Sequence, residues 1–384
     1  MTWLDELAAD TAALTEAGRV RFLREITPLP GARAMLDGKI YLNFSSNDYM
    51  GIAGDAELRR CFYEQHPDCS TPELAQSSAS SRLLTGNTPA YTRLEETLSK
   101  LYNNRAALVF NSGYHANIGI LPALAHSGDL ILSDKLNHAS IIDGMRLCDA
   151  EFRRYPHLDL EQLEKQLAAR RAAFRRVFLV TESVFSMDGD AADLARLVEL
   201  KKKYDCILVV DEAHSVGVRG PQGTGLAAEL DVADEIDVLI GTFGKAFGST
   251  GAYAIMAPEV KQFLVNHMRP FIFTTGLPPV ILNWSRFVLE HCAEMDAKRA
   301  KLRRMGQLLR ELFGDATTPG DSQIVPCRVG EDADAVAAAE RFRNHGILVF
   351  AIRPPTVPAH TARLRFSLSA ALEESAIEQI REAL

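Results

Sequence analysis

Lys245 is the residue of this chain best suited to covalent chemistry. It stands among small residues in Thr242–Gly248, directly after the apolar run Val238–Gly241, which is typical of a buried strand. Desolvation at the end of a buried strand lowers the pKa of a lysine, and its free amine then forms a Schiff base with a carbonyl cofactor. A solvated lysine beside a glycine turn fits these seven residues equally well, so other residues have to decide between the two interpretations.

Asp211 and His214 follow another apolar run, Cys206–Val210. An unpaired carboxylate is costly at the exit of such a strand, so we expect a cationic partner for Asp211. A protonated pyridine nitrogen fits, because the ion pair keeps the ring cationic and able to accept electrons from a carbanion. The alternative is an aspartate that caps the next turn. His214 is close enough in sequence to hydrogen-bond the phenolic oxygen of the same ring, although a lone histidine is more often structural.

Further candidates follow other predicted strands. Gly113 and Tyr114 stand between a strand and a helix, where small residues let backbone amides approach a phosphate. His138 follows Leu130–Leu132 and is suited to stack on an aromatic cofactor, with a histidine that merely begins a helix as the alternative. Ser186 is a candidate for the polar edge of the cofactor.

Two arginines near the C-terminus are candidates for binding a carboxylate. Arg363 and Arg365 follow the stiff segment Ile352–Pro358 and, in a strand, point to the same face. A guanidinium suits a carboxylate better than an ammonium does. A surface position is the alternative for each, and we expect at most one of them to bind substrate.

The composition indicates a folded protein without a nucleic-acid or membrane partner. Of 384 residues, 47% are hydrophobic and 24% charged, and the formal charge of −8 argues against a general nucleic-acid binder while allowing a local basic pocket. The N-terminus lacks a secretory signal and no stretch has the length of a transmembrane span. Six scattered cysteines form no C-x-x-C pair, so we expect no disulfide framework and no metal site. These features predict a cytoplasmic protein.

The predicted strands and helices that position the candidate residues indicate an α/β fold. From Ala106 to about Met256, short apolar runs alternate with amphipathic helical stretches, which indicates a largely parallel sheet covered by helices on both faces. Ligands gather at the carboxyl ends of such strands, where most of the candidates above lie. The predicted strands are Ala107–Phe110, Leu130–Leu132, Val177–Val180, Ile207–Val210 and Val238–Ile240.

Length and pattern predict more than one folding unit. We expect an N-terminal segment over 1–45, a large domain over 46–280, and a linking helix with a small α+β domain over 281–384. The linking helix begins near Val280 and runs through Asp296–Arg304, whose charges we interpret as a solvated face. Strand candidates of the small domain are Ile324–Pro326, Ile347–Phe350 and Leu364–Leu368.

Taken together, these residues resemble the α-oxoamine synthase family within the fold-type I pyridoxal-phosphate enzymes. The resemblance covers nearly the whole chain and implies a fold-type I transferase, with a large domain on a mostly parallel sheet, a smaller α+β C-terminal domain, and pyridoxal 5'-phosphate as cofactor. Within the family, Ile352–Pro358 looks most like the members that join L-alanine to a pimeloyl thioester in biotin biosynthesis. The resemblance to the family rests on the motifs Asn43–Tyr49, Ser112–Tyr114, His138–Ser140, Ser186–Asp190, Asp211–His214 and Thr242–Lys245.

The resemblance implies a role for each matching residue. Lys245 would hold the cofactor as a Schiff base and act as acid and base, while Asp211 pairs with the pyridinium nitrogen and His138 stacks on the ring and contacts substrate. The remaining cofactor contacts would be Gly113, Tyr114, Ser186, His214 and Thr242. The remaining substrate contacts would be Arg21 and Thr356 for the acyl group and Arg365 for the amino-acid carboxylate.

The resemblance also implies a homodimer with active sites at the interface. Thr274 or Thr275 would contact the cofactor phosphate of the other subunit, and the acyl group would arrive on coenzyme A or on an acyl carrier protein. The chain departs from the family at Ser77–Arg82, where a glycine-rich loop is usual. Positive φ angles are harder to reach without glycine, so this loop is expected to be reshaped.

Three alternatives remain open at this point. The first is another member of the family, above all a glycine C-acetyltransferase that uses glycine and acetyl-CoA. The second is a non-catalytic partner subunit of the same fold, against which the presence of Lys245, Asp211 and His138 argues. The third is an aminotransferase, which would release neither carbon dioxide nor free thiol.

Overall fold

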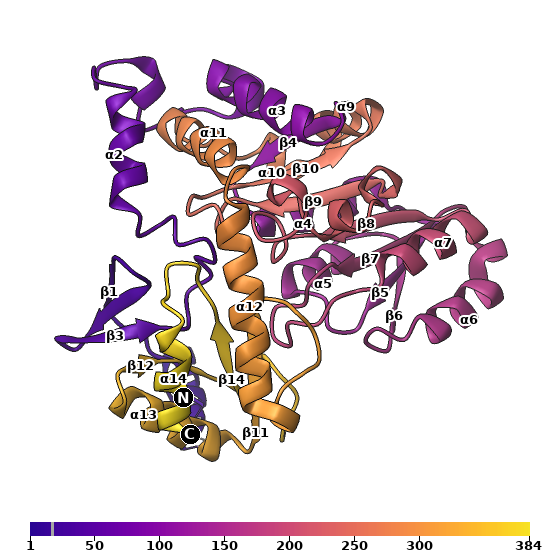
Figure 1. Ribbon diagram of the computed structural model, residues 1–384. Helices are drawn as coiled ribbons and strands as arrows, with labels where there is room; N and C mark the ends of the chain where they lie inside the picture. Colours follow the sequence, from indigo (N-terminus) through magenta and orange to yellow (C-terminus); the bar gives the residue numbers. More distant parts are fainter. Residues whose placement is uncertain (17–18) are drawn as a thin grey trace.

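A seven-stranded sheet forms the centre of the computed structural model, which describes residues 1–16 and 19–384 (Figure 1). All neighbouring strands run parallel except β10, which is antiparallel to both of its neighbours. This arrangement confirms the predicted α/β class. In spatial order the strands are β4 (Ala106–Phe110), β10 (Ala252–Met256), β9 (Val238–Thr242), β8 (Ile207–Asp211), β7 (Val177–Glu182), β5 (Leu130–Asp134) and β6 (Glu151–Tyr155).

The five strands expected in this region all form, and each extends one or two residues beyond the apolar run that predicted it. Asp211 and Thr242 are thereby the last residues of their strands. The sequence pattern missed β6 and β10. The exposed edge strand β6 carries mostly polar side chains, so it lacks the apolar run that marks a buried strand.

Helices cover both faces of this sheet, as expected. Two layers of buried side chains separate the helices from the strands. One face is covered by α4 (Gly113–Leu124), α5 (Ala139–Arg146), α9 (Pro258–His267) and α10 (Arg269–Ile272). The other is covered by α3 (Pro89–Leu101), α6 (Leu160–Arg170), α7 (Leu194–Tyr204), α8 (Leu226–Glu229) and α11 (Pro279–Cys292).

The small domain is built on a three-stranded antiparallel sheet in the order β11-β14-β13. Its strands are β11 (Ile324–Gly330), β13 (Ala351–Ile352) and β14 (Ala362–Ser367). Its helices are α12 (Asp296–Phe313), α13 (Asp332–Asn344) and α14 (Ser375–Ala383). The strand predicted over Ile347–Phe350 is too long, because β12 covers only Ile347–Leu348. β12 does not belong to this three-stranded sheet and pairs with β3 (Lys39–Asn43) instead.

The N-terminal segment is joined to the small domain by strand pairing. Three strands form a meander whose last member, β3, pairs in parallel with β12, with Leu42 opposite Ile347. Figure 1 shows this sheet beside α13 and α14. The elements of the segment are α1 (Trp3–Glu16), β1 (Ile26–Leu29), β2 (Arg33–Leu36) and β3 (Lys39–Asn43), followed by α2 (Ala56–Glu64).

The single linking helix expected from Val280 onward is wrong, because the chain forms two helices, α11 and α12, with a break after Cys292. Arg299 stabilises the break, since its guanidinium donates to the carbonyls of Cys292 at 2.8 Å and Ala293 at 3.0 Å. Arg299 is part of the charged run Asp296–Arg304, which was interpreted as a solvated face. It is only 8% exposed, so this interpretation is wrong for Arg299.

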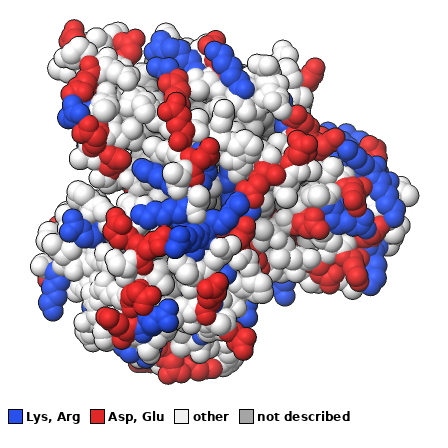
Figure 2. Space-filling view, viewed as in Figure 1, with Lys and Arg blue, Asp and Glu red and all other residues white. Residues whose placement is uncertain are grey.

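The other charges of this run do lie near solvent. Figure 2 shows one face of the molecule, with a band of Lys and Arg side chains across its middle. The band lies over the N-terminal half of α12. Acidic side chains adjoin the band, as in the contact of Arg303 with Glu229 at 3.0 Å. None of the helices in the described part of the chain is both long and apolar enough to cross a membrane.

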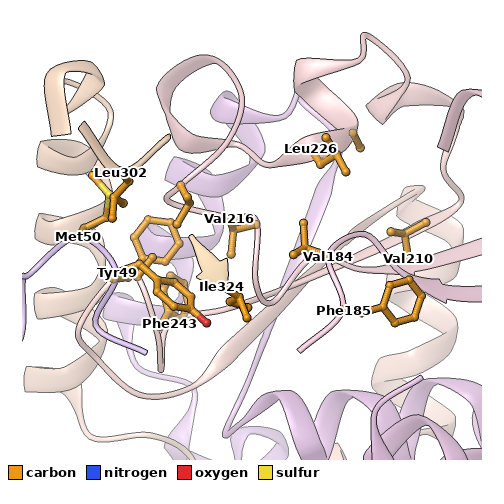
Figure 3. Packing of buried hydrophobic residues seen from close by; sticks show 14 of the residues in the cluster. Tyr49, Met50, Val184, Phe185, Val210, Val216, Leu226, Phe243, Leu302 and Ile324 are labelled. Carbon is orange, nitrogen blue, oxygen red and sulfur yellow. The ribbon is translucent and has the colours of Figure 1, made fainter. Parts of the chain in front are cut away.

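The core joins the N-terminal segment, the large sheet and the small domain. Figure 3 shows Tyr49, Phe243 and Ile324 packed together from three distant parts of the chain. All three are fully buried. Residues just after β3 are therefore held against the loop that carries Lys245.

Candidate active site

Lys245 lies in a tight turn between β9 and β10. The Gly248 amide donates to the Lys245 carbonyl at 2.9 Å, and the Gly244 amide donates to Thr242 Oγ1 at 3.1 Å. Thr242 in turn donates its hydroxyl proton to the Gly251 carbonyl at 3.0 Å. These bonds hold the lysine at the carboxyl end of the sheet and occupy the Thr242 hydroxyl within the turn.

The amine of Lys245 is 2.8 Å from Nε2 of His214. Burial lowers the pKa of Lys245 to about 8; the carboxylates of Asp211 and Glu182 oppose this shift, and the charge of Arg365 adds to it. At pH 7 about one tenth of the amine is therefore unprotonated, and at pH 8 about half of it. A solvated loop lysine would show no such shift.

Asp211 is paired in register with Glu182 on the neighbouring strand, so the two carboxyl groups share one face of the sheet. Asp211 accepts hydrogen bonds from Asn117 Nδ2 at 2.7 Å and from the Ala213 amide at 2.9 Å. Glu182 is 2% exposed, and its Oε1 has no hydrogen-bond partner within the described residues. Burial raises the pKa of Glu182 to about 8, and the charge of Asp211 adds to this rise.

His214 lies between Lys245 and the N-terminal segment. It is buried, and its Nδ1 is 2.7 Å from the hydroxyl of Tyr49. Burial holds the pKa of His214 well below its usual range, with further lowering by Lys245, Arg365 and His138. The imidazole is therefore neutral, with one nitrogen as donor and the other as acceptor.

His138 immediately precedes α5, and its Nδ1 is 2.7 Å from the hydroxyl of Ser140. Ser140 also accepts from Asn117, which connects His138 to the amide that holds Asp211. Burial lowers the pKa of His138. Its ring belongs to the same polar cluster as Asp211 and Lys245, whose charges act on it.

The N-terminus of α4 is open at Gly113. Ser112 caps the helix by accepting from the His115 amide at 3.1 Å, and a Cβ built on Gly113 would meet no other described atom within 4 Å. Free backbone amides at this end suit an anion such as a phosphate. The Tyr114 side chain instead donates to Asp143 at 2.7 Å and remains 47% exposed.

Arg363 and Arg365 both lie on β14 and are both buried, so the surface alternative is wrong for each. Arg363 forms an ion pair with Asp188. Arg365 donates to the Ser186 carbonyl and, at 3.2 Å, to Asn47 Oδ1. Only Arg365 reaches the cluster around Lys245, because its charge acts on that amine.

The two residues suggested for the acyl group meet although they are 335 positions apart. Arg21 Nη2 donates to Thr356 Oγ1 at 3.2 Å. Thr356 borders a cavity of about 270 Å³ that is also lined by Ser186 and by the apolar side chains of Met187 and Val357. The lining also includes Asp188, Asp190 and Arg363, so the cavity combines apolar surface with charged groups. Such a mixed cavity suits an acyl chain that carries a polar end.

Thr274 and Thr275 lie near the start of α4 in the same chain. Asn111, two residues before Gly113, donates to the Thr275 carbonyl at 2.7 Å and approaches Thr274 Oγ1 at 3.4 Å. Thr275 itself is exposed. Its hydroxyl is therefore free of the core and accessible to a neighbouring molecule.

The serine-rich segment Ser77–Arg82 contains a left-handed residue although it has no glycine, at a conformation that was expected to be harder to reach. Ala79 has a φ of 48°. The Ser77 hydroxyl accepts from the Ala79 amide at 2.9 Å, and Ser78 donates to the Gly276 carbonyl at 2.8 Å. Local serine hydrogen bonds hold the backbone in a conformation that alanine disfavours.

Sequence reasoning assigned no role to three residues that belong to the site: Tyr49, Asn117 and Glu182. Tyr49 was visible only as the last residue of the motif Asn43–Tyr49, and Asn117 lies outside the motifs. Nothing local indicates that each has a hydrogen-bond partner more than 90 positions away. Glu182 could have been found from the sequence. It is a charged residue at the end of an apolar strand, and ligands bind at the carboxyl ends of such strands.

The comparisons with known proteins agree with this geometry. The model of the family described as aminotransferase class I and II matches residues 39–384. The chain is 51% identical to the 8-amino-7-oxononanoate synthase of Chlorobaculum parvum, over 98% of this chain and 96% of the relative, and 48% identical to that of Haemophilus ducreyi, over 96% and 97%. It is also similar to the solved serine palmitoyltransferase of S. paucimobilis with bound PLP–myriocin aldimine, with a TM-score of 0.89 and 28% identity, over 100% of this chain and 97% of that one.

Proposed function

The chain belongs to the class I and II aminotransferase family, and from this membership we propose that it condenses L-alanine with a pimeloyl thioester, with loss of carbon dioxide, to give 8-amino-7-oxononanoate. The observation that carries this proposal is the buried amine of Lys245, with its pKa lowered to about 8, in one cluster with Asp211 and Arg365. The near full-length similarity to 8-amino-7-oxononanoate synthases supports the choice of substrates.

The residues of the site fit pyridoxal 5'-phosphate as cofactor. A buried free amine suits its aldehyde, the carboxylate of Asp211 suits its ring nitrogen, and the open start of α4 at Gly113 suits its phosphate. His138, Ser186 and His214 would also hold it, and Thr242 would have to exchange its hydrogen bond to the Gly251 carbonyl for one to the cofactor. When bound, this cofactor supplies a cationic ring that withdraws electrons from the α-carbon of an amino acid.

Lys245 moves protons in the proposed reaction. Its amine, neutral in part near pH 7 and largely so above pH 8, takes the α-proton of alanine and later returns a proton to the product. Asn117 and the Ala213 amide donate hydrogen bonds to Asp211 and thereby hold its carboxylate in position for a cationic partner.

Substrate recognition falls to the arginines and to the cavity next to them. Arg365 binds the carboxylate of alanine, since its guanidinium is buried and lies within the charge cluster of Lys245. Arg21 and Thr356 contact the acyl group at the edge of the apolar cavity. The thiol leaves when the α-carbon of alanine bonds to the thioester carbonyl. The bond from the α-carbon to the carboxylate then breaks, carbon dioxide leaves, and a proton takes its place.

We further propose a cytoplasmic homodimer in which the exposed Thr275 contacts the cofactor phosphate of the other subunit. The acyl group arrives on coenzyme A or on an acyl carrier protein. Neither a nucleic acid nor a membrane takes part.

The test is a substrate comparison with the purified protein and pyridoxal phosphate. Free thiol and carbon dioxide are followed with L-alanine or glycine, each with pimeloyl-CoA, with pimeloyl-acyl carrier protein or with acetyl-CoA, and Lys245→Ala serves as the inactive control. We expect equal amounts of thiol and carbon dioxide with alanine and one or both of the pimeloyl thioesters only. A preference for glycine and acetyl-CoA would assign the chain to the glycine C-acetyltransferases, and no release with any pair would refute the proposal.

A further inference from the structure

One face of the small-domain sheet carries a row of three arginines. Antiparallel pairing places Arg328 on β11 directly opposite Arg363 on β14, so both side chains lie on the same face. Arg365 is two residues farther along β14 and shares that face. At about 3.4 Å per residue, Arg363 and Arg328 lie about 7 Å along the strands from Arg365. Because the charge of Arg365 acts on Lys245, the row begins at the candidate active site and leads away from it.

The cavity of about 270 Å³ connects the two ends of this row. Its lining includes Ser186, whose carbonyl accepts a hydrogen bond from Arg365, and it also includes Arg363 and Arg328. A chain that leaves the site at Ser186 and fills the cavity therefore comes within reach of Arg328. The apolar side chains along the cavity wall are Leu136, Phe185, Met187 and Val357.

Two of the three basic side chains among the described residues that line this cavity have acidic partners. Arg363 forms an ion pair with Asp188, which lines the cavity as well. His157 is 2.9 Å from Asp190 and 2.9 Å from Asp134. Burial opposes the charge of this histidine, but its bonds to the two aspartates raise its pKa to about 10. Both basic groups are therefore charged and neutralised by the protein itself.

Arg328 is the third basic group, and within residues 1–16 and 19–384 it has neither an ion pair nor a hydrogen-bond partner for its guanidinium. Its charge stands opposite that of Arg363, and like charges directly opposite each other on neighbouring strands are unfavourable. Asp188 supplies one negative charge for these two arginines. Arg328 is also exposed, so it lies where the cavity meets solvent. This rim therefore suits one additional carboxylate.

We propose that Arg328 binds the distal carboxylate of the acyl substrate and so selects a dicarboxylic acyl chain over a monocarboxylic chain of equal length. This role rests on the proposed function and adds the group that distinguishes a pimeloyl chain from a simple fatty acyl chain. A guanidinium suits the role, because it can donate two parallel hydrogen bonds to one carboxylate.

Arg21 is the other basic residue near this rim, and its contribution has to be distinguished from that of Arg328. Arg21 donates to Thr356, which lines the cavity, but it is not itself among the described residues of the lining. The hydrogen bond to Thr356 already engages its guanidinium at the edge of the cavity. Both arginines are therefore substituted in the test.

The experiment compares a pimeloyl thioester with a heptanoyl thioester, which has the same chain length and lacks the distal carboxylate. Both are presented on the carrier that supports the faster thiol release with L-alanine, and kcat and KM are measured for the protein loaded with pyridoxal phosphate. In Arg328→Leu we expect KM for the pimeloyl thioester to rise roughly fivefold, as suits a partly solvated ion pair, with kcat unchanged. The constants for the heptanoyl thioester should not change. Arg328→Lys should recover part of the preference, because it keeps the charge.

The control is Arg381→Leu, which removes an exposed arginine of the same domain that pairs with Glu378 outside the cavity. It should leave both thioesters unaffected. An unchanged preference for the pimeloyl thioester in Arg328→Leu would overturn the proposal, as would an equal rise of KM for both thioesters or a loss of preference in Arg21→Leu alone. These outcomes leave the proposed function intact. If no pimeloyl thioester releases thiol with alanine, the proposed function fails and the role of Arg328 fails with it.

A second measurement does not depend on turnover. Without L-alanine the thioester binds but has no partner for condensation, so calorimetry measures binding alone. The dissociation constant of the pimeloyl thioester should rise roughly fivefold in Arg328→Leu, and that of the heptanoyl thioester should stay the same. Equal affinity of Arg328→Leu and the unmodified protein for the pimeloyl thioester would refute the assignment.

Discussion

At the scale of single residues, the properties of Lys245 come from its surroundings. Burial removes much of the solvation that an ammonium needs, and Arg365 adds repulsion, while Asp211 and Glu182 restore part of the charged form. The balance is a pKa of about 8. Asn117 fixes the position of Asp211, because its amide donates to this buried carboxyl group at 2.7 Å.

The first prediction concerns the pH dependence of cofactor attachment. Only the unprotonated amine attacks an aldehyde, so the attachment rate should rise with pH and level off above the pKa of Lys245, about 8. The measurement is the rate of absorbance change after pyridoxal phosphate is mixed with cofactor-free protein at each pH. Free Nα-acetyl-lysine is the control, and its rate should keep rising to about pH 10. A protein profile that matches this control would contradict the buried assignment.

The second prediction concerns Asn117. Replacement by leucine removes an N–H donor from a buried carboxylate, which should weaken cofactor binding roughly tenfold, or about 1.4 kcal/mol. The dissociation constant of pyridoxal phosphate measures this. Asn283 is a matched control, since it is also buried but donates to the Glu73 carbonyl. Asn283→Leu should lower stability and leave cofactor affinity unchanged.

At the scale of elements, loops and helix ends shape the site more than the strands do. The strands bring Asp211 and Thr242 to one edge of the sheet, while the turn after β9 presents Lys245 and the open start of α4 presents backbone amides. The serine-rich segment borders this region through Ser81, which bridges to Thr275. Its strained backbone at Ala79 is therefore next to the proposed subunit contact.

The third prediction tests that strain. Ala79→Gly relieves a left-handed φ and should raise the free energy of unfolding by about 0.5 to 1 kcal/mol. Denaturant unfolding measures the change. Ala75→Gly is the control, because Ala75 has a φ of −58° and gains nothing from glycine. It should be neutral or destabilising, and equal stabilisation by both substitutions would contradict the argument.

At the scale of the whole molecule, the N-terminal segment joins the two domains. The meander pairs with β12 of the small domain, and the chain then continues through Tyr49 into the core beside the Lys245 loop. Just after this segment, the backbone of Gly51 passes close to the small domain. Gly51 has a φ of 71°, and a Cβ atom built on it lies 2.6 Å from the Cβ atom of Ala371. Domain contact and site geometry thus depend on the same few residues.

The fourth prediction compares two glycines of the N-terminal region. Gly51→Ala should destabilise the protein by roughly 2 to 4 kcal/mol, because a methyl group clashes with the small domain in addition to backbone strain. Gly38 has a similar φ of 73° with no other described atom within 4 Å of its built Cβ, so Gly38→Ala should cost only about 1 kcal/mol. Thermal or denaturant unfolding measures both. Equal losses would show that the contact with Ala371 contributes nothing.

The amino-acid sequence by itself determined the α/β class, the family and the predicted strands of the large sheet, because these depend on local patterns that repeat along the chain. It also identified Lys245, Asp211 and His214 as candidates, since each lies within four residues after an apolar run. The roles assigned to these residues stay predictions.

Only the tertiary structure decided what surrounds them. The break between α11 and α12, the pairing of β3 with β12, and the contacts of Tyr49 and Asn117 all join segments through side chains or strand edges whose partners no local pattern names. The lowered pKa of Lys245 was likewise decided only by the tertiary structure. Burial and charge depend on what packs around a group in three dimensions, whereas strand and helix periodicity depends on neighbours in the chain.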